Sequence, residues 1–235
     1  MNSLIIGNGQ IGRAVREVIT ANDEVITYDK NDDNFEFKVN PDILHICFPY
    51  SEKFIEEVKW YIQGVKPWHV IIWSTVPIGT TKKIRGAVHS PVEGTHPRLA
   101  RSIKNSVKWI GANDEGETEF FERYFKDLFI RTKLVNSSDF TEALKLLSTT
   151  EYGVNIEFAR YKKRVADAIN MNYELTKEWN QHYNKLYHNL GIDWAQKYVL
   201  DAPVGPKGGH CVTPNAQLLY EQYPDELVKI VGEIE

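Results

Sequence analysis

The sequence predicts an α/β protein in which a doubly wound parallel sheet is followed by a mainly helical part. Up to residue 137, short apolar runs alternate with helical apolar spacing, as the strands and crossover helices of a parallel sheet do. The runs are nearly all apolar, which is typical of strands covered on both faces. After residue 137 the spacing is helical and no convincing strand pattern follows. We therefore expect two domains, residues 1–137 and 138–235.

Each element of the first domain has its own pattern. The first apolar run ends at Gly7, and apolar residues then follow at the i, i+3, i+4, i+7, i+8 spacing of an amphipathic helix from Ile11 to Ile19. The same alternation continues along the chain. Strands are expected at residues 3–6, 24–28, 43–48, 69–74, 107–110 and 132–135, and further helices at 54–61 and 118–128.

The second domain is expected to be helical. Asp139 followed by Glu142 resembles a capping box and indicates where its first helix begins. Apolar and aromatic residues continue at helical spacing as far as Tyr187, and we interpret them as core or subunit contacts. A loop rich in glycine and proline is expected at residues 204–214, and a final helix at 218–231.

Composition and charge narrow the function classes. Lys plus Arg is 28 and Asp plus Glu is 32, so the net charge of −4 argues against nucleic acid as a partner. The apolar runs fall far short of the roughly 20 residues that cross a bilayer, and the N-terminus does not resemble a secretory signal. Two cysteines cannot form a disulfide framework, although they allow one bridge. We expect a cytoplasmic, reduced protein without a membrane span.

The hexapeptide Gly7-Asn8-Gly9-Gln10-Ile11-Gly12 has the G-x-G-x-x-G spacing of a dinucleotide-binding turn. Gly7 permits the tight turn, Gly9 lets the backbone approach a pyrophosphate, and Gly12 lets the helix lie close to the sheet. The helix N-terminus would face the phosphates. Because strand, turn and helix stand in this order, we expect a Rossmann-type domain whose six turn residues bind the cofactor. The alternative is a doubly wound domain whose glycine turn is only a turn.

The end of the second strand indicates which dinucleotide binds. Asp29 stands where an acidic residue accepts hydrogen bonds from an adenosine ribose. Its carboxylate would repel a 2′-phosphate, so NAD is favoured over NADP, although the adjacent Lys30 weakens this preference. Pro49, Ser74 and Thr75 complete the expected cofactor-binding set.

Three further segments are unusual enough to be interpreted together. They are Ser74-Thr75-Val76-Pro77-Ile78-Gly79-Thr80, Glu142-Ala143-Leu144-Lys145 and Gly208-Gly209-His210-Cys211. In this order they resemble the UDP-glucose/GDP-mannose dehydrogenase family, which includes the UDP-N-acetylmannosamine dehydrogenases. The resemblance runs from Gly7 to about Leu219. It implies a helical second domain like that of 6-phosphogluconate dehydrogenase, and a homodimer formed through long helices.

The resemblance also implies a reaction. In that family a sugar primary alcohol is oxidised to a carboxylate in two NAD-dependent hydride transfers, and a cysteine thiolate traps the aldehyde as a thiohemiacetal. Cys211 matches that cysteine and precedes the final helix, whose N-terminus would favour a thiolate. Lys145 matches the lysine that stabilises the oxyanion, and Thr75 a threonine near the nicotinamide. Cys47 lies inside an apolar strand, and we expect it in the core.

The chain departs from the family pattern at three positions. Thr149 stands for an asparagine, Asn215 for an aspartate that activates water, and Val92 for a glutamate, with Glu93 one place later. These changes bear most directly on the hydrolysis step. We still count Thr149 and Asn215 among the catalytic positions. The expected substrate-binding residues are Glu93, His96, Arg98, Lys145, Gly208, Gly209 and His210, with Arg101 adding to the basic cluster around His96.

Two further expectations complete the sequence analysis. His45 with Cys47, and His210 with Cys211, lack the spacing of zinc sites, so no metal is expected. Family members continue past the cysteine into a second α/β domain, so we expect a truncated form that takes a sugar or nucleotide-sugar-like substrate. The alternatives are a single-step dehydrogenase of a small hydroxy acid, and a non-catalytic NAD-binding protein.

Overall fold

The chain divides into two compact units, which are described separately. The computed structural model describes residues 1–29, 39–205 and 211–234. The N-terminal unit is Met1–Lys145 and the C-terminal unit is Leu146–Glu235. The division falls inside one long helix, α5 (Ser138–Ala168).

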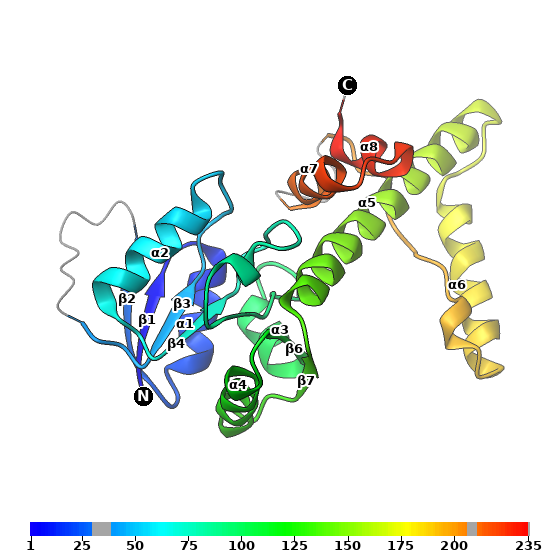
Figure 1. Ribbon diagram of the computed structural model, residues 1–235. Helices are drawn as coiled ribbons and strands as arrows, with labels where there is room; N and C mark the ends of the chain where they lie inside the picture. Colours follow the sequence, from blue (N-terminus) through cyan, green and yellow to red (C-terminus); the bar gives the residue numbers. More distant parts are fainter. Residues whose placement is uncertain (30–38, 206–210, 235) are drawn as a thin grey trace. The chain divides into compact units, whose positions relative to one another are not determined.

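The N-terminal unit is built on a seven-stranded sheet, in the order β2-β1-β3-β4-β5-β6-β7 (Figure 1). All neighbouring strands are parallel except β5 and β6. The chain moves outward from β1 in both directions, which creates a switch point between β1 and β3 where doubly wound sheets bind ligands. The strands are β1 (Asn2–Ile6), β2 (Glu24–Tyr28), β3 (Ile43–Ile46), β4 (His69–Ile72), β5 (Ala87–His89), β6 (Lys108–Gly111) and β7 (Thr132–Val135).

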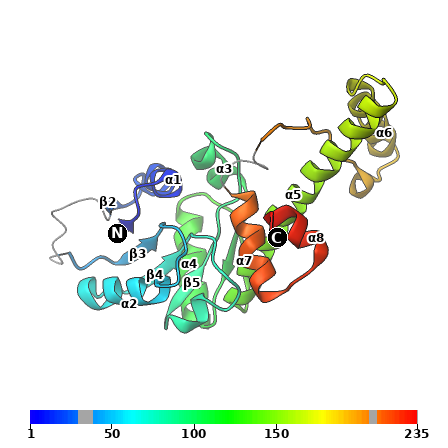
Figure 2. The same cartoon turned by 90° about the horizontal axis from the view of Figure 1, so that it is seen from above.

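Helices cover both faces of this sheet, which explains why the strands are nearly all apolar. Side chains alternate along a strand, so Ile5 packs with α1 (Gln10–Ile19) while Leu4 and Ile6 pack with α2 (Phe54–Val65). Figure 2 shows α1 and α2 on opposite sides of the strands. The remaining helices of this unit are η1 (Thr81–Lys83), α3 (Leu99–Asn105) and α4 (Glu115–Asp127).

The C-terminal unit is helical. Besides most of α5 it contains α6 (Glu174–Asn189), η2 (Asp193–Ala195), α7 (Val212–Gln222) and α8 (Glu226–Gly232). Gly153 of α5 lies so close to Val212 and Val231 that an added Cβ would meet their methyl carbons at 2.6 and 2.3 Å. None of the described helices combines the length and the apolar character that crossing a membrane requires.

The predicted fold class is confirmed, since a mostly parallel, doubly wound sheet is followed by helices. The structure corrects three details. The sequence patterns predict no strand at β5, which is three residues long. The single helix expected over residues 218–231 is wrong, because Pro224 interrupts it and Asp225 caps α8 by accepting from the Leu227 N–H at 2.8 Å.

The third correction concerns the loop expected at residues 204–214. Residues 206–210 lie outside the described ranges, but α7 already begins at Val212. Pro214 is therefore inside the first turn of α7, where the missing N–H has no partner in the helix to lose. Val212, Ala216 and Leu219 give this helix its buried side.

A chain of buried polar side chains crosses the core of the N-terminal unit. The Trp73 indole N–H donates to Nδ1 of His45 at 3.1 Å, and Nε2 of His45 lies 3.2 Å from Oγ of Ser3. Ser3 donates in turn to Asp23 at 2.6 Å, and the Tyr124 hydroxyl donates to the same carboxylate oxygen at 2.8 Å. These bonds require a neutral His45 with its proton on Nε2.

Burial lowers the pKa of His45 to about 3. The unfolded chain, with an ordinary histidine pKa of 6.5, therefore binds one proton more than the folded chain between these two values. Because the unfolded state binds more protons there, the free energy of unfolding falls as the pH drops through this window.

We expect His45→Asn to make the protein less sensitive to acid. One unfolding-linked proton corresponds to about 1.4 kcal/mol per pH unit, so the slope of the free energy of unfolding between about pH 4 and 6 should decrease by that amount. Urea unfolding at a series of pH values measures the slope. The exposed His182 supplies the control, since His182→Asn should keep the wild-type slope. An unchanged slope in His45→Asn would contradict a neutral, buried His45.

Candidate functional site

The turn between β1 and α1 has the geometry that the glycine spacing predicts. Gly7 has a φ of +104°, a conformation that favours glycine. A Cβ on Gly12 would lie 1.8 Å from the carbonyl oxygen of Gly7, so only glycine lets α1 approach the turn this closely. A Cβ on Gly9 would meet nothing within 4 Å. Two glycines are thus required by the fold, whereas Gly9 borders open space.

The first turn of α1 presents its backbone to that space. Asn8, Gly9 and Gln10 are exposed, Ile11 is half-buried, and no acidic residue lies in the first helical turn. The Asp29 carboxylate accepts a hydrogen bond from the Asn8 N–H at 2.8 Å. Asp29 therefore lies beside the turn at the end of β2. The free N–H groups of a helix N-terminus attract anions, and the residues present fit a dinucleotide pyrophosphate.

The segments after β3 and β4 are fastened to each other. The Ser74 hydroxyl donates to the Phe48 carbonyl at 2.6 Å, and Nε2 of His89 donates to the Ser74 carbonyl at 3.1 Å. Pro49 is exposed and Thr75 is half-buried, both at the edge of the sheet that carries the glycine turn. The hydroxyl of Ser74 is thus used within the fold.

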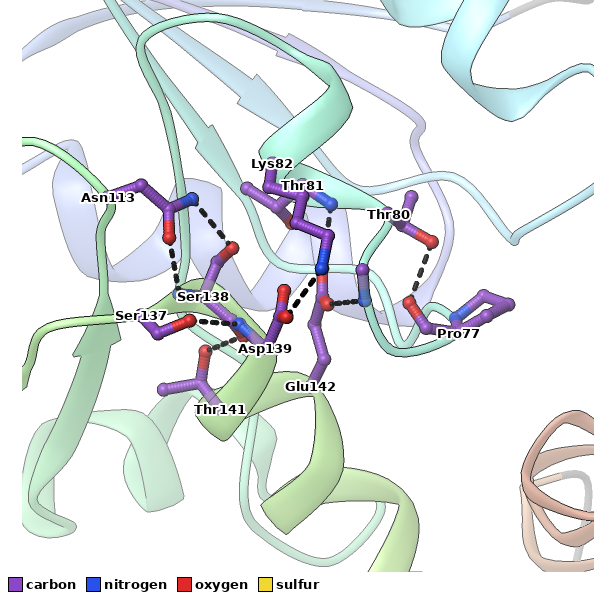
Figure 3. A network of polar contacts seen from close by, with 11 residues as sticks. Pro77, Thr80, Thr81, Lys82, Asn113, Ser137, Ser138, Asp139, Thr141 and Glu142 are labelled. Atoms are coloured by element: carbon purple, nitrogen blue, oxygen red, sulfur yellow. Dashed lines mark hydrogen bonds and ion pairs between the residues drawn. The ribbon is translucent and has the colours of Figure 1, made fainter. Parts of the chain in front are cut away.

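The buried side chain of Glu142 binds backbone N–H groups of the loop after β4 (Figure 3). Its carboxylate accepts from the Gly79 N–H at 2.6 Å and from the Thr81 N–H at 2.8 Å. The side chain is fully buried, and this burial raises the pKa of Glu142 above its ordinary value. One turn earlier, Asp139 pairs with Lys82 at 2.7 Å. The start of α5 is therefore tied to the loop that follows β4.

Lys145 lies one turn further along α5. Its Nζ donates to the Val92 carbonyl at 2.9 Å, and its side chain is half-buried. Val92 is buried, whereas Glu93, His96 and Arg98 are exposed. The side chain of Lys145 thus contacts the loop after β5. Arg98 is the N-cap residue of the short helix α3, and Arg101 lies in its first turn.

The remaining predicted residues belong to the C-terminal unit. Cys211 is exposed and occupies the N-cap position of α7. One turn later, the buried Asn215 donates its amide to Oγ1 of Thr149 at 3.2 Å. Two of the three positions that depart from the family pattern are therefore bonded to each other. Gly208, Gly209 and His210 lie outside the described residues.

Sequence reasoning missed three buried groups that shape the site. Glu142 belongs to one of the three motifs, but no pattern in the sequence predicts its hydrogen bonds to the loop after β4. His89 bridges the Ser74 carbonyl and the Thr141 hydroxyl, the latter at 2.8 Å, and burial lowers its pKa to about 3. Lys108 donates to the Ser90 and Pro91 carbonyls at 3.0 and 2.6 Å. The sequence signal for a buried role of Lys108 is its place as a charged residue at the start of an apolar strand.

The C-terminal unit has a cavity of about 380 Å³ between α5, α6 and residues 196–200, and it contains no residue singled out from the sequence. Within the described ranges, no cluster of three His, Cys, Asp or Glu side chains could hold a metal ion. As expected, Cys47 is buried in the core.

Comparison with known proteins extends these observations. No family model matches the chain. A curated relative, the UDP-N-acetyl-D-mannosamine dehydrogenase of Methanocaldococcus jannaschii, is 24% identical over 223 residues, which cover 82% of this chain. The chain spans about half, 48%, of that relative's length.

Solved structures with the same fold include the UDP-D-ManNAc dehydrogenase of Pyrococcus horikoshii, at a TM-score of 0.81 and 19% identity, covering 99% of this chain and 68% of that one. The 3-hydroxyisobutyrate dehydrogenase of Mycobacterium tuberculosis has a TM-score of 0.70 and 13% identity, covering 99% and 91%. The resemblance indicated by the motifs is confirmed: the chain is similar in sequence to curated UDP-N-acetyl-D-mannosamine dehydrogenases and has the fold of solved nucleotide-sugar dehydrogenases.

Proposed function

We propose that this chain is an NAD-dependent dehydrogenase that oxidises an alcohol of a sugar or nucleotide-sugar-like substrate. The observation that carries the proposal is the β1–α1 turn, where two glycines are required by the fold and Gly9 borders open space. The order of the three motifs and the curated relative add the substrate class. NAD, when bound, supplies the hydride acceptor.

The cofactor would be held by groups that the structure already presents. The N-terminus of α1 faces the pyrophosphate, and Asp29 beside the turn accepts from the adenosine ribose. Thr75 and Pro49, at the carboxyl ends of β4 and β3, would border the nicotinamide side. The Ser74 hydroxyl stabilises this edge of the sheet, because it donates a hydrogen bond to the Phe48 carbonyl.

The reaction needs a cation and a nucleophile. The ammonium of Lys145 would stabilise the oxyanion that develops when the alcohol loses its proton and hydride. The Cys211 thiol would then add to the aldehyde carbon, and a second hydride transfer would leave a thioester. Hydrolysis of this thioester gives the carboxylate and returns the thiol. A nucleophilic Cys211 has to stay reduced, which supports a cytoplasmic location.

A second candidate is a single oxidation without hydrolysis, as in a small hydroxy-acid dehydrogenase. It is favoured by the pair formed by Asn215 and Thr149, because an amide and a hydroxyl bonded to each other supply no base for water. Under this candidate Lys145 keeps its role and Cys211 has none. A non-catalytic NAD-binding protein is the remaining alternative.

A homodimer is part of the proposal. The C-terminal unit exposes several large apolar side chains along α5 and α6, and a surface of this kind is typical of an interaction site. Trp179, with 72% of its surface exposed, lies at the middle of α6.

We expect Gly9→Val to weaken NAD binding without unfolding the protein. The new side chain occupies the space that a pyrophosphate would fill, so affinity for NAD should fall about tenfold or more, while stability changes by about 1 kcal/mol. Gly12→Ala is the contrasting variant and should cost about 3 kcal/mol of stability, because its Cβ collides with Gly7. Isothermal titration with NAD and urea unfolding measure the two effects. Undiminished binding by Gly9→Val would place the cofactor elsewhere.

The number of NADH formed per substrate distinguishes the candidates. With UDP-, GDP- and free sugars as substrates, complete oxidation should yield two NADH per molecule, and Cys211→Ala should lose the second. Cys47→Ala, in the core, is the matched control and should keep the wild-type ratio. One NADH in both wild type and Cys211→Ala would favour the single oxidation. An absence of NADH with intact NAD binding would favour the non-catalytic protein.

Disrupting the exposed apolar face should convert the dimer to a monomer. Trp179→Glu places a charge on α6, and burying it in an interface would cost several kcal/mol. Trp68→Glu is the control, because Trp68 is 79% exposed in the N-terminal unit, away from α6 in the sequence. Light scattering after gel filtration measures the mass. A wild-type monomer, or a Trp179→Glu dimer, would contradict this interface.

A further inference from the structure

A lysine is buried in the core of the N-terminal unit. Lys108 begins β6, and only 2% of its surface is exposed. Its Nζ lies 4.4 Å from the centre of the Trp73 ring and donates to the carbonyls of Ser90 and Pro91. Among the described residues, no carboxylate oxygen forms a salt bridge with it. Lys108 therefore satisfies backbone groups and is not half of an ion pair.

The two carbonyls that Lys108 holds belong to the same loop that Lys145 contacts. Ser90, Pro91 and Val92 are consecutive and buried. Lys108 binds the first two carbonyls from β6, and Lys145 binds the third from α5. Two lysines from different elements thus share one three-residue segment.

We propose that Lys108 is a positioning residue for Lys145, which it acts on through the carbonyls of Ser90, Pro91 and Val92. The proposal rests on the proposed function, in which Lys145 stabilises an oxyanion. By fixing the Ser90 and Pro91 carbonyls, Lys108 fixes the direction of the next carbonyl and therefore the place where the Lys145 ammonium lies.

The charge of Lys108 gives this connection a dependence on pH. The pKa of Lys108 is lowered to about 7, chiefly by burial; the charge of Lys145 acts in the same direction, whereas Glu93 and Cys47 act in the opposite direction. The other titratable group beside it is His89, which burial keeps neutral near pH 7. A neutral amine still carries two N–H groups, enough for both carbonyls. Deprotonation therefore removes a repelling charge and turns two charge-assisted hydrogen bonds into weaker neutral ones, which changes how firmly the two carbonyls are held.

This arrangement would affect the proposed reaction near neutral pH. When Lys108 is charged, two ammonium groups repel each other across one loop. Once Lys108 is neutral, that repulsion no longer displaces the Lys145 ammonium from the position in which it would stabilise an oxyanion.

Lysine NMR tests the connection without relying on activity. In the full chain labelled with ¹³C-lysine, the Cε resonance of Lys145 should show a step at the pH where Lys108 titrates, about 7. Lys108→Met should remove that step. The exposed Lys133, on the neighbouring strand, supplies the control, since Lys133→Met should leave the step unchanged.

A variant at the surface provides a second test, because Lys108→Met changes the core and can prevent folding. Glu93 is exposed, and its carboxylate raises the pKa of Lys108. Glu93→Gln should therefore move the titration of Lys108 and the step at Lys145 together to lower pH, by roughly half a unit. A Lys145 resonance without the step, or a step that stays in place in Glu93→Gln, would overturn the proposal.

Kinetics separate this inference from the proposed function. If the protein forms NADH, the pH profile of kcat should have an inflection at the same pH, and Lys108→Met should lose it while the affinity for NAD stays within about twofold of wild type. The step at Lys145 without any NADH would refute the dehydrogenase and support the connection between the two lysines. NADH formation without the step would refute the connection and support the dehydrogenase.

Discussion

Backbone groups buried at the carboxyl edge of the sheet have no water to bond, so side chains from neighbouring elements must satisfy them. The loop after β3 is held by the Ser74 hydroxyl, the loop after β4 by the Glu142 carboxylate, and the loop after β5 by the Lys108 ammonium. A buried group that loses its partner costs about 1–3 kcal/mol. The edge where cofactor and substrate are proposed to bind therefore takes its shape from a few buried polar side chains.

The same burial controls the charge of these side chains. A low-polarity surrounding disfavours the charged form, and it lowers the pKa values of His45, His89 and Lys108 while it raises that of Glu142. His45 and His89 are used as neutral groups that both donate and accept, which a charged imidazole cannot do. Lys108 differs because its pKa is near 7 and its hydrogen bonds need only two of its protons. It can change charge without releasing the loop, whereas the histidines cannot.

The sequence was most informative where one local pattern decides the structure. The glycine turn, the strands and the helices of the first domain follow from spacing, because each contacts the core through a regular face. A three-residue strand such as β5 carries too few residues for a period, and α7 begins directly after Cys211 and includes Pro214, a residue that is typical of loops. The roles of Glu142 and Lys108 depend on partners 61 and 17 residues away, which no local pattern encodes. The bond between Thr149 and Asn215 joins positions 66 residues apart and could only be found in three dimensions.

That bond bears on how far the proposed oxidation can proceed. Hydride transfer needs an oriented alcohol and a cation, and addition of a thiol to an aldehyde needs only a reactive Cys211. Hydrolysis of a thioester is different, since the attacking water must lose a proton to a base. Asn215 has no basic atom, and its amide is bonded to Thr149, whose hydroxyl also donates to the Leu146 carbonyl at 3.1 Å. Under the proposed function, the first steps depend on Lys145 and Cys211, whereas hydrolysis requires a base other than the Asn215–Thr149 pair. If Cys211 forms a thioester, its release is the step at which this chain should be slowest.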